Sequence, residues 1–292
     1  MPETSAPLLA TLGLAWNWAR RSVDAADARV LLRETTGCPN GAWISHPEQP
    51  LSDAQQAQLR TWVTARQHGT PVAHLLGWRE FYGHRFVISA DVLIPRPDTE
   101  TLVDAALRLL PAELPARVLD LGTGSGCIAV SLALARPRWR VTATDVSSAA
   151  LAVAEHNVQR LGAGNVRCLH GNWYAPVSGC FDLIVSNPPY IAADDPHLQA
   201  GDLRFEPATA LTPGGDGLDA LRAVAAGALA HLQPGGWLLV EHGWDQAATV
   251  AVVLAQAGLK NVLTWRDLGG HVRVSGGRFP GGAEVAAASA SG

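Results

Sequence analysis

The sequence predicts an α/β fold in which a doubly wound, mostly parallel seven-stranded sheet follows a small N-terminal bundle of helices. From residue 99 onward, short β-rich runs alternate with helical stretches, which is typical of a parallel sheet with helices on both faces. Helical patterns alone occupy the first 77 residues. Near the end, two β-rich runs joined through Gly269 and Gly270 predict a terminal antiparallel hairpin.

Length and composition set the domain organisation. A chain of 292 residues suits one medium-sized domain and a smaller companion, and 48% hydrophobic against 16% charged residues supply material for buried cores. We therefore expect a helical domain over residues 1–77, a β-hairpin linker over 78–98, an α/β domain over 99–279 and a disordered tail over 280–292. The tail is rich in Gly, Ala and Ser.

The helical domain and the linker differ in their local signals. Ser52 followed by Gln55 fits a capping box, apolar residues at helical spacing come next, and Gly69 supplies a stop. Beyond residue 77, the stretch 81–88 predicts a hairpin, and prolines at 95 and 97 force extended backbone that excludes helix. The connection between the domains is therefore expected here.

The seven strands of the α/β domain are short runs rich in β-branched and apolar residues. The strands expected before the terminal hairpin are 117–121, 141–144, 166–169, 181–186 and 237–240, and those of the hairpin are 262–266 and 272–275. Helices are expected over 148–161 and 218–232. The carboxyl ends of the parallel strands form the edge at which such sheets bind ligands.

The first strand of this sheet runs directly into a glycine-rich turn, Gly122-Thr123-Gly124-Ser125-Gly126. Glycines let the backbone approach a ligand closely, and the helix N-terminus that follows favours an anionic group. Asp145 ends the next strand, where a carboxylate can accept hydrogen bonds from ribose hydroxyls. The pair predicts a nucleoside cofactor, and the GxGxG spacing favours S-adenosylmethionine (SAM) over a dinucleotide. The alternative is that the glycine-rich turn has only a structural role and that Asp145 is a helix N-cap.

A second candidate site, Asn187-Pro188-Pro189-Tyr190, follows the buried strand 181–186. The Asn187 side-chain oxygen and the Pro188 carbonyl can each accept a hydrogen bond from a target NH₂ group, while the prolines hold the backbone stiffly. Orientation of this kind suits a planar amide or aromatic amine facing a methyl donor, and Tyr190 offers a flat face for packing. The tetrapeptide indicates methyl transfer to an sp² nitrogen, and a Pro-Pro turn with Asn187 as a turn former is the alternative.

Charge and cysteine content argue against several other classes. The net charge is −4, and nine Arg balance nine acidic residues before residue 99, so no cationic field favours a nucleic-acid partner. The cysteines at 38, 127, 168 and 180 lack CxxC spacing, so we expect buried free thiols, and no metal site.

The N-terminus has no basic signal region, and the apolar stretch 8–16 is too short for a bilayer. A cytoplasmic protein without membrane contact is expected.

These motifs resemble those of the class I SAM-dependent methyltransferases that carry an NPPY tetrapeptide and, more narrowly, those of the HemK/PrmC family. The resemblance implies a partner and substrate among peptide-chain release factors, methylated on the side-chain amide nitrogen of the glutamine in a Gly-Gly-Gln motif. Its most discriminating part is the segment from Pro95 to Glu100. The matching segments are 71–77, 81–83, 94–100, 120–126, 187–190 and 205–207, with Leu211.

The same resemblance assigns roles to individual residues. It places the SAM contacts on Gly122, Thr123, Gly124, Ser125, Gly126, Asp145, Trp173 and Asn187, with Trp173 against the adenine. It places the substrate contacts on Asn187, Pro188, Pro189 and Tyr190, of which Asn187, Pro188 and Tyr190 are catalytic. The helical domain would recognise the release factor. The region 241–244 varies and has no assigned role, and Val272 stands where an acidic residue is usual.

Several other functions share parts of this pattern. An adenine-N6 DNA methyltransferase uses the same tetrapeptide but would need a base-flipping partner domain, which the neutral helical domain does not supply. A ribosomal-protein glutamine methyltransferase is the other alternative, and within the family resemblance the Pro95–Glu100 segment separates it from the release-factor enzymes. A nicotinamide-dependent oxidoreductase conflicts with the GxGxG spacing. A non-enzymatic SAM-binding module would not need Asn187.

Overall fold

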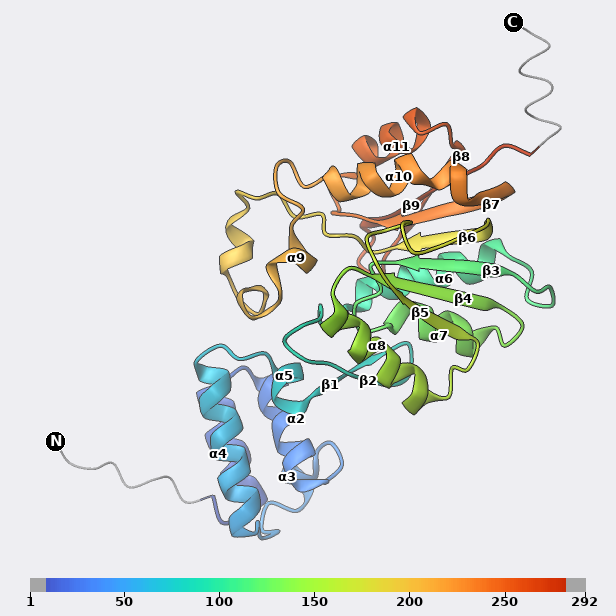
Figure 1. Ribbon diagram of the computed structural model, residues 1–292. Helices are drawn as coiled ribbons and strands as arrows, with labels where there is room; N and C mark the ends of the chain where they lie inside the picture. Colours follow the sequence, from blue (N-terminus) through green and yellow to red (C-terminus); the bar gives the residue numbers. More distant parts are fainter. Residues whose placement is uncertain (1–8, 282–292) are drawn as a thin grey trace, which may run out of the picture. The chain divides into compact units, whose positions relative to one another are not determined.

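The computed structural model describes residues 9–281, and its contacts divide the chain into two compact units, 1–77 and 78–292 (Figure 1). The tail predicted to be disordered from residue 280 lies outside the described residues, apart from its first two positions. Over the described range, no helix has the length and apolar character needed to cross a membrane.

The first unit is a small bundle of helices with its own hydrophobic core. The predicted capping box is confirmed, because Ser52 and Gln55 bond reciprocally at the start of α4. Leu31 and Leu59 are fully buried in the core of this unit. The helices in its described part are α1 (Leu12–Ser22), α2 (Ala25–Thr36), α3 (Ala42–Ser45), α4 (Asp53–Gln67) and α5 (Val72–Leu76).

The second unit begins with an antiparallel hairpin of β1 (Trp78–Phe81) and β2 (His84–Val87). Phe81 and Phe86 are buried in the core of this unit. Asn157 on α8 (Ser148–Leu161) accepts a hydrogen bond from the Val87 N–H and donates one to the Val87 carbonyl, each at 2.8 Å. The hairpin expected in a linker is therefore an integral part of the second unit. A strand pattern does not reveal what its apolar side chains pack against.

The predicted α/β fold class is confirmed by a seven-stranded sheet of order β5-β4-β3-β6-β7-β9-β8 (Figure 1). Strands β3 to β7 pair in parallel, and β9 pairs antiparallel with both β7 and β8. The strands are β3 (Arg117–Leu121), β4 (Arg140–Asp145), β5 (Val166–His170), β6 (Phe181–Ser186), β7 (Leu232–Glu241), β8 (Lys260–Arg266) and β9 (Val272–Arg278).

Helices cover both faces of this sheet, as a doubly wound fold requires. Val118 on β3 packs into one core with α6, α7 and α8, and its neighbour Leu119 packs into another with α10 and α11. The side chains of consecutive residues on this buried strand thus pack into hydrophobic cores on opposite faces of the sheet. The helices are η1 (Pro97–Thr99), α6 (Glu100–Leu109), α7 (Cys127–Ala135), α8, η2 (Pro196–Gln199), η3 (Leu203–Phe205), α9 (Ala208–Leu211), α10 (Asp219–His231) and α11 (Ala247–Gln256).

The carboxyl ends of β3 and β6 form the point at which the strand order reverses. From β3 the chain continues to β4 and β5 on one side, then returns to β6 and β7 on the other. Loops that leave neighbouring strands in opposite directions open a crevice between them. Ser186 at the end of β6 donates to the Leu121 carbonyl at the end of β3, at 2.8 Å. The glycine-rich turn and the Asn187 tetrapeptide therefore start side by side.

Candidate active site

Three glycines with left-handed backbone shape the turn after β3. Gly122, Gly124 and Gly126 have φ angles of 72°, 54° and 80°, which residues with a side chain rarely adopt. A Cβ atom on Gly126 would lie 3.2 Å from the Cβ of Ala154 on α8, whereas one on Gly124 would meet no atom within 4 Å. Gly126 thus allows close packing of a helix, and Gly124 leaves open space for a ligand.

Asp145 supports this turn from the end of β4. Its Oδ2 accepts a hydrogen bond from the Gly124 N–H, and its Oδ1 accepts one from the Ser147 N–H, each at 2.9 Å. The N-cap of α8 is Ser147 and not Asp145, because the Ser147 hydroxyl accepts the Ala150 N–H. Each carboxylate oxygen keeps a further lone pair. Asp145 can therefore hold the turn and at the same time accept a hydrogen bond from a hydroxyl group of a ligand.

A second carboxyl group, Asp120, lies beneath the turn. The Thr123 hydroxyl donates to its Oδ2 at 2.6 Å. Burial raises the pKa of Asp120 to about 7, although the Thr123 hydrogen bond opposes this shift. The contact fixes Thr123 to the end of β3.

Trp173 lies against the glycine turn. Its backbone has a φ of 44°, which is strained for a residue with a side chain. A Cβ atom on Gly122 would lie 3.5 Å from the Trp173 ring, and the Thr144 hydroxyl donates to the Trp173 carbonyl at 3.3 Å. Trp173 is thus a half-buried wall residue whose ring lines the cleft.

One cleft brings most of the predicted cofactor residues together. Its lining includes Gly122, Thr123, Gly124, Ser125, Asp145, Trp173, Asn187 and Pro189, but not Gly126, Pro188 or Tyr190. Two further walls carry no role predicted from local motifs. They comprise Asp91, Val92, Leu93, Pro95, Arg96 and Thr99 on one side, and Pro207, Thr209 and Ala210 on the other.

A buried carboxylate joins these two walls. Glu206 accepts a hydrogen bond from the Ile94 N–H at 2.8 Å and forms an ion pair with Arg96. The Glu206 side chain is fully buried, whereas that of Arg96 is 32% exposed, so only the carboxylate is shielded from water. The opposite charges of Arg96 and Glu206 are visible in the sequence, but they stand 110 positions apart, and no local pattern pairs them.

The Asn187 carboxamide is oriented by a residue from the first wall. Its Nδ2 donates to the hydroxyl of buried Thr99 at 3.2 Å. No hydrogen bond to its Oδ1 is described within residues 9–281, so this oxygen remains an acceptor. The segment Pro95–Glu100, which the sequence marks only as a family motif, therefore belongs to the site through the contact between Thr99 and Asn187.

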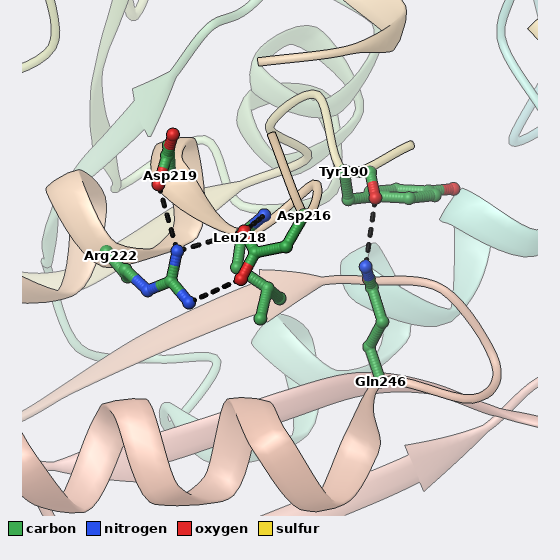
Figure 2. A network of polar contacts seen from close by, with 6 residues as sticks. All are labelled: Tyr190, Asp216, Leu218, Asp219, Arg222 and Gln246. Carbon is green, nitrogen blue, oxygen red and sulfur yellow. Dashed lines mark hydrogen bonds and ion pairs between the residues drawn. The ribbon is translucent and has the colours of Figure 1, made fainter. Parts of the chain in front are cut away.

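Tyr190 is held at both its backbone and its side chain. Its hydroxyl donates to Glu241 at the end of β7, at 3.2 Å. Its carbonyl accepts a hydrogen bond from the Gln246 side chain at 2.9 Å (Figure 2). Gln246 is itself fixed, because its Oε1 accepts the Gly243 N–H at 2.8 Å. The loop after β7 thus fastens the tetrapeptide. It contains Gly243, from the stretch 241–244 that had no predicted role, and Gln246 just beyond that stretch.

A glycine-containing loop packs against the backbone after Tyr190. Gly217 has a φ of 79°, and a Cβ atom there would lie 2.5 Å from the Tyr190 carbonyl oxygen. Only glycine allows so close an approach. Figure 2 shows the loop held from α10, where Arg222 pairs with Asp216 at 2.6 Å and with Asp219 at 2.9 Å.

Glu241 is the second buried carboxyl group near the cleft. Burial raises its pKa to about 7, whereas hydrogen bonds from Thr99 and Tyr190 and the charge of Arg273 oppose this shift. Arg273 on β9 contacts Asp98 at 3.1 Å and Asp267 at 2.9 Å. The carboxyl group therefore lies between the tetrapeptide, the Pro95–Glu100 segment and the terminal hairpin.

One of the four cysteines, Cys127, belongs to the lining of the cleft, where its thiol contacts the Ser125 hydroxyl. All four are free; Cys38 and Cys127 are buried, but Cys168 and Cys180 are only half-buried, so the expectation of buried thiols was wrong for these two. Cys168 lies in the middle of β5, an edge strand of the sheet, and Cys180 directly precedes β6. No group of three or more His, Cys, Asp or Glu side chains suitable for a metal ion occurs in the part of the chain that the structure describes.

Two family models match this chain, one in each unit. Residues 99–229 match the methyltransferase small domain, and residues 16–77 match the PrmC N-terminal domain. The second match lies within the helical unit. Both models agree with the resemblance inferred from the motifs.

Solved structures show the same fold at low sequence identity. A methyltransferase from Pyrococcus furiosus is 20% identical, with a TM-score of 0.51, and covers 79% of this chain and 100% of its own. A 16S rRNA methyltransferase from T. thermophilus, in complex with AdoMet and guanosine, is 19% identical with a TM-score of 0.50, and the match covers 69% of this chain and 49% of its own. These similarities establish the class I methyltransferase fold.

Several proteins are much more similar to this chain in sequence than the solved structures are, and each of them is named release factor glutamine methyltransferase. The Bordetella pertussis protein is 54% identical over 86% of this chain and 93% of its own. The Xylella fastidiosa (strain Temecula1) protein is 50% identical over 90% of this chain and 96% of its own length. The Burkholderia pseudomallei protein is 47% identical over 96% of this chain and 98% of its own length. The similarity spans both units and the whole cleft. This chain therefore belongs to the family of release factor glutamine methyltransferases, which are SAM-dependent enzymes.

Proposed function

We propose that this protein transfers a methyl group from SAM to the side-chain amide nitrogen of the glutamine in the Gly-Gly-Gln motif of peptide-chain release factors. The observation that carries the proposal is the Asn187 carboxamide, which Thr99 holds so that Oδ1 stays free as an acceptor beside the glycine turn. The names of the relatives supply the substrate class. A cytoplasmic location and a role in translation termination follow from that substrate.

The cleft residues fit SAM as the cofactor. Gly124 leaves room for the ligand, Asp145 would accept hydrogen bonds from the ribose hydroxyls, and the Trp173 ring would pack on the adenine. The buried Ser125 hydroxyl lines the cleft beside the thiol of Cys127, which is only a weak hydrogen-bonding group. This hydroxyl is therefore available to the carboxylate of the amino-acid end. When bound, SAM supplies a methyl group on a positively charged sulfur that leaves as a neutral thioether.

The tetrapeptide would orient the target amide. The Asn187 Oδ1 and the Pro188 carbonyl would accept one N–H each, so that the nitrogen lone pair points towards the methyl carbon. Fixed acceptors stabilise the positive charge that develops on the nitrogen. No strong base is needed, because the extra proton becomes acidic once the nitrogen is methylated. Tyr190 and Pro189 would pack against the planar amide.

Methyl transfer from labelled SAM tests this function directly. We expect label on an intact release factor, and none on the same factor with the Gly-Gly-Gln glutamine replaced by asparagine. Duplex DNA tests the adenine alternative, and a ribosomal protein tests the other glutamine alternative. Label on DNA or on the ribosomal protein, with none on the release factor, would overturn the proposal.

The helical unit, residues 1–77, would recognise the body of the release factor while the glutamine loop enters the cleft. Its separate core and its match to the PrmC N-terminal domain support this division of labour. A whole release factor should then have a KM at least about tenfold below that of a short Gly-Gly-Gln peptide, with a similar kcat. Equal KM values for the factor and the peptide would contradict docking by the helical unit.

A further inference from the structure

The buried carboxyl group of Glu241 has no part in the function proposed above. Its residue is only 1% exposed, and its Oε2 has no hydrogen-bond partner among residues 9–281. A buried carboxyl group opposes stability unless its partners compensate, and an apolar side chain of similar size avoids that cost. Packing alone therefore does not explain a carboxyl group at the end of β7.

The contacts of Glu241 lead towards the substrate pocket on two sides. The Tyr190 hydroxyl donates to Oε1 at 3.2 Å. The Thr99 hydroxyl also stabilises the carboxylate, and the same hydroxyl accepts the Asn187 Nδ2–H at 3.2 Å. A threonine hydroxyl has one proton and two lone pairs, so it can donate to Glu241 while it accepts from Asn187.

We propose that Glu241 is a positioning residue for methyl transfer, which holds the Tyr190 ring directly and the Asn187 carboxamide through Thr99. The inference rests on the proposed function, because it concerns the same substrate pocket. Glu241 is not among the residues that line the cleft, so it acts only through its neighbours. One carboxylate thereby joins the tetrapeptide to the segment that carries Thr99.

Charged and titratable groups face Glu241 from several elements. Arg273 on β9 favours the charged carboxylate, whereas Asp98 on η1 disfavours it. Burial raises the pKa of Tyr190 far above neutrality and that of Cys127, at the start of α7, to about 12, so both stay neutral. Burial dominates at Glu241 and raises its pKa to about 7. Its charge therefore changes in the range where the enzyme can be assayed.

The pH response follows from this arrangement. Above pH 7 the carboxylate accepts charge-assisted hydrogen bonds from Tyr190 and Thr99, which are stronger than neutral ones. Protonation below pH 7 weakens both contacts and loosens the pocket. We expect kcat of the wild-type enzyme to fall about three- to fivefold between pH 8 and pH 6 from this cause. The affinity for SAM should stay nearly constant between pH 8 and pH 6.

The test compares Glu241→Gln, Glu241→Ala, Tyr190→Phe and the double variant Glu241→Ala with Tyr190→Phe. Tyr82→Phe is the matched control, because the Tyr82 hydroxyl also donates to a carboxylate, that of Asp104 at 2.8 Å, but lies outside the cleft. For each protein, kcat and KM for a release factor are measured from pH 6 to pH 8.5. Calorimetry gives the Kd for SAM, and thermal melting reports folding.

The conservative variant separates positioning from structure. Glu241→Gln keeps an oxygen that can accept from Tyr190 but cannot ionise, so kcat at pH 8 should be about three- to fivefold below wild type, without the acid-side fall. Glu241→Ala should lower kcat about 20-fold, with the SAM Kd within about twofold of wild type. In the double variant the two losses should add only in part, because both substitutions remove the same contact between Glu241 and Tyr190. Tyr82→Phe should keep the wild-type pH profile.

Three results would overturn the role of Glu241 without touching the proposed function. The first is a Glu241→Gln enzyme whose kcat still falls on the acid side as in wild type, and the second is full additivity of Glu241→Ala with Tyr190→Phe. A loss of SAM affinity that matches the loss of kcat would also contradict it, since that is expected of a general structural defect. If the wild-type enzyme transfers no methyl group to any release factor, the proposed function itself fails.

Discussion

The two halves of the cleft are built in different ways. The cofactor half consists of one strand-turn-helix segment, 120–135, whose left-handed glycines are fixed by Asp145 from the next strand. The substrate half depends on residues far apart in sequence, since Asn187 is bound by Thr99, 88 positions away, and Tyr190 by Glu241, 51 positions away. The cofactor half is thus encoded locally, whereas the substrate half forms only when the sheet has assembled.

This difference predicts a separation of effects. Changes in the cofactor half should alter the affinity for SAM and spare kcat once SAM is saturating. Changes in the substrate half should alter kcat or the KM for the release factor far more than the affinity for SAM. Substitutions that mix the two effects would show that the halves are not independent.

The largest effect is expected from Asn187→Ala, which removes the acceptor that orients the target amide. We expect kcat to fall about 10²–10³-fold, because a fixed polar group at the reacting atoms contributes that much. The SAM Kd should rise less than about tenfold, since Asn187 is only one of several predicted cofactor contacts. Single-turnover methyl transfer and calorimetry measure the two quantities. A kcat loss below tenfold would contradict the role of Asn187.

On the cofactor side, Asp145→Ala should weaken SAM binding about 10- to 100-fold, because a charged acceptor for ribose and the support of Gly124 are both lost. The kcat at saturating SAM should stay within about threefold of wild type. Asp145→Asn keeps one oxygen and should show a smaller loss of affinity. An unchanged Kd in the alanine variant would exclude Asp145 from the cofactor site.

Thr99→Val probes the long-range contact to Asn187. It removes the hydroxyl that accepts the Asn187 Nδ2–H but keeps the volume of the side chain, so kcat should fall about tenfold. Thr99→Ser retains the hydroxyl and should stay within about twofold of wild type. Equal activities for the two variants would show that the hydroxyl does not orient Asn187.

The smallest effect is expected from Gln246→Glu, which keeps the acceptor for Gly243 but loses the donor to the Tyr190 carbonyl. We expect about a fivefold rise in the KM for the release factor and a loss of about 1 kcal/mol in the free energy of unfolding. Steady-state kinetics and urea unfolding check both. A variant equal to wild type in both measurements would remove Gln246 from the support of Tyr190.

Much of the fold could be predicted from the sequence because its signals are local. The strands 117–121 and 181–186 and the helix 148–161 have the predicted ends, since periodicity and glycine or serine boundaries define them. The glycine turn was identified for the same reason. A hairpin was predicted from the stretch 81–88 and is formed by residues 78–87. Its place in the second unit depends on Asn157, which no local pattern reveals.

The substrate half shows the limit of local signals. The tetrapeptide stands out because two prolines and an asparagine follow a buried strand, yet its supports do not. Glu241 lies in the stretch 241–244, to which no role was assigned, and Gln246 follows that stretch. Thr99 was marked only as part of the Pro95–Glu100 family motif, and its contact with Asn187 arises from the fold. Their roles arise from tertiary contacts, so sequence pattern alone could not predict them.

The central claim is that the methyl group is transferred to a glutamine side chain. The most direct measurement is mass spectrometry of a release factor after incubation with the enzyme and SAM, with fragmentation to locate the added methyl group. We predict a single methyl group on the side-chain amide nitrogen of the Gly-Gly-Gln glutamine with the wild-type enzyme, and none with Asn187→Ala. A methyl group on any other atom, or an unmodified factor, would contradict it.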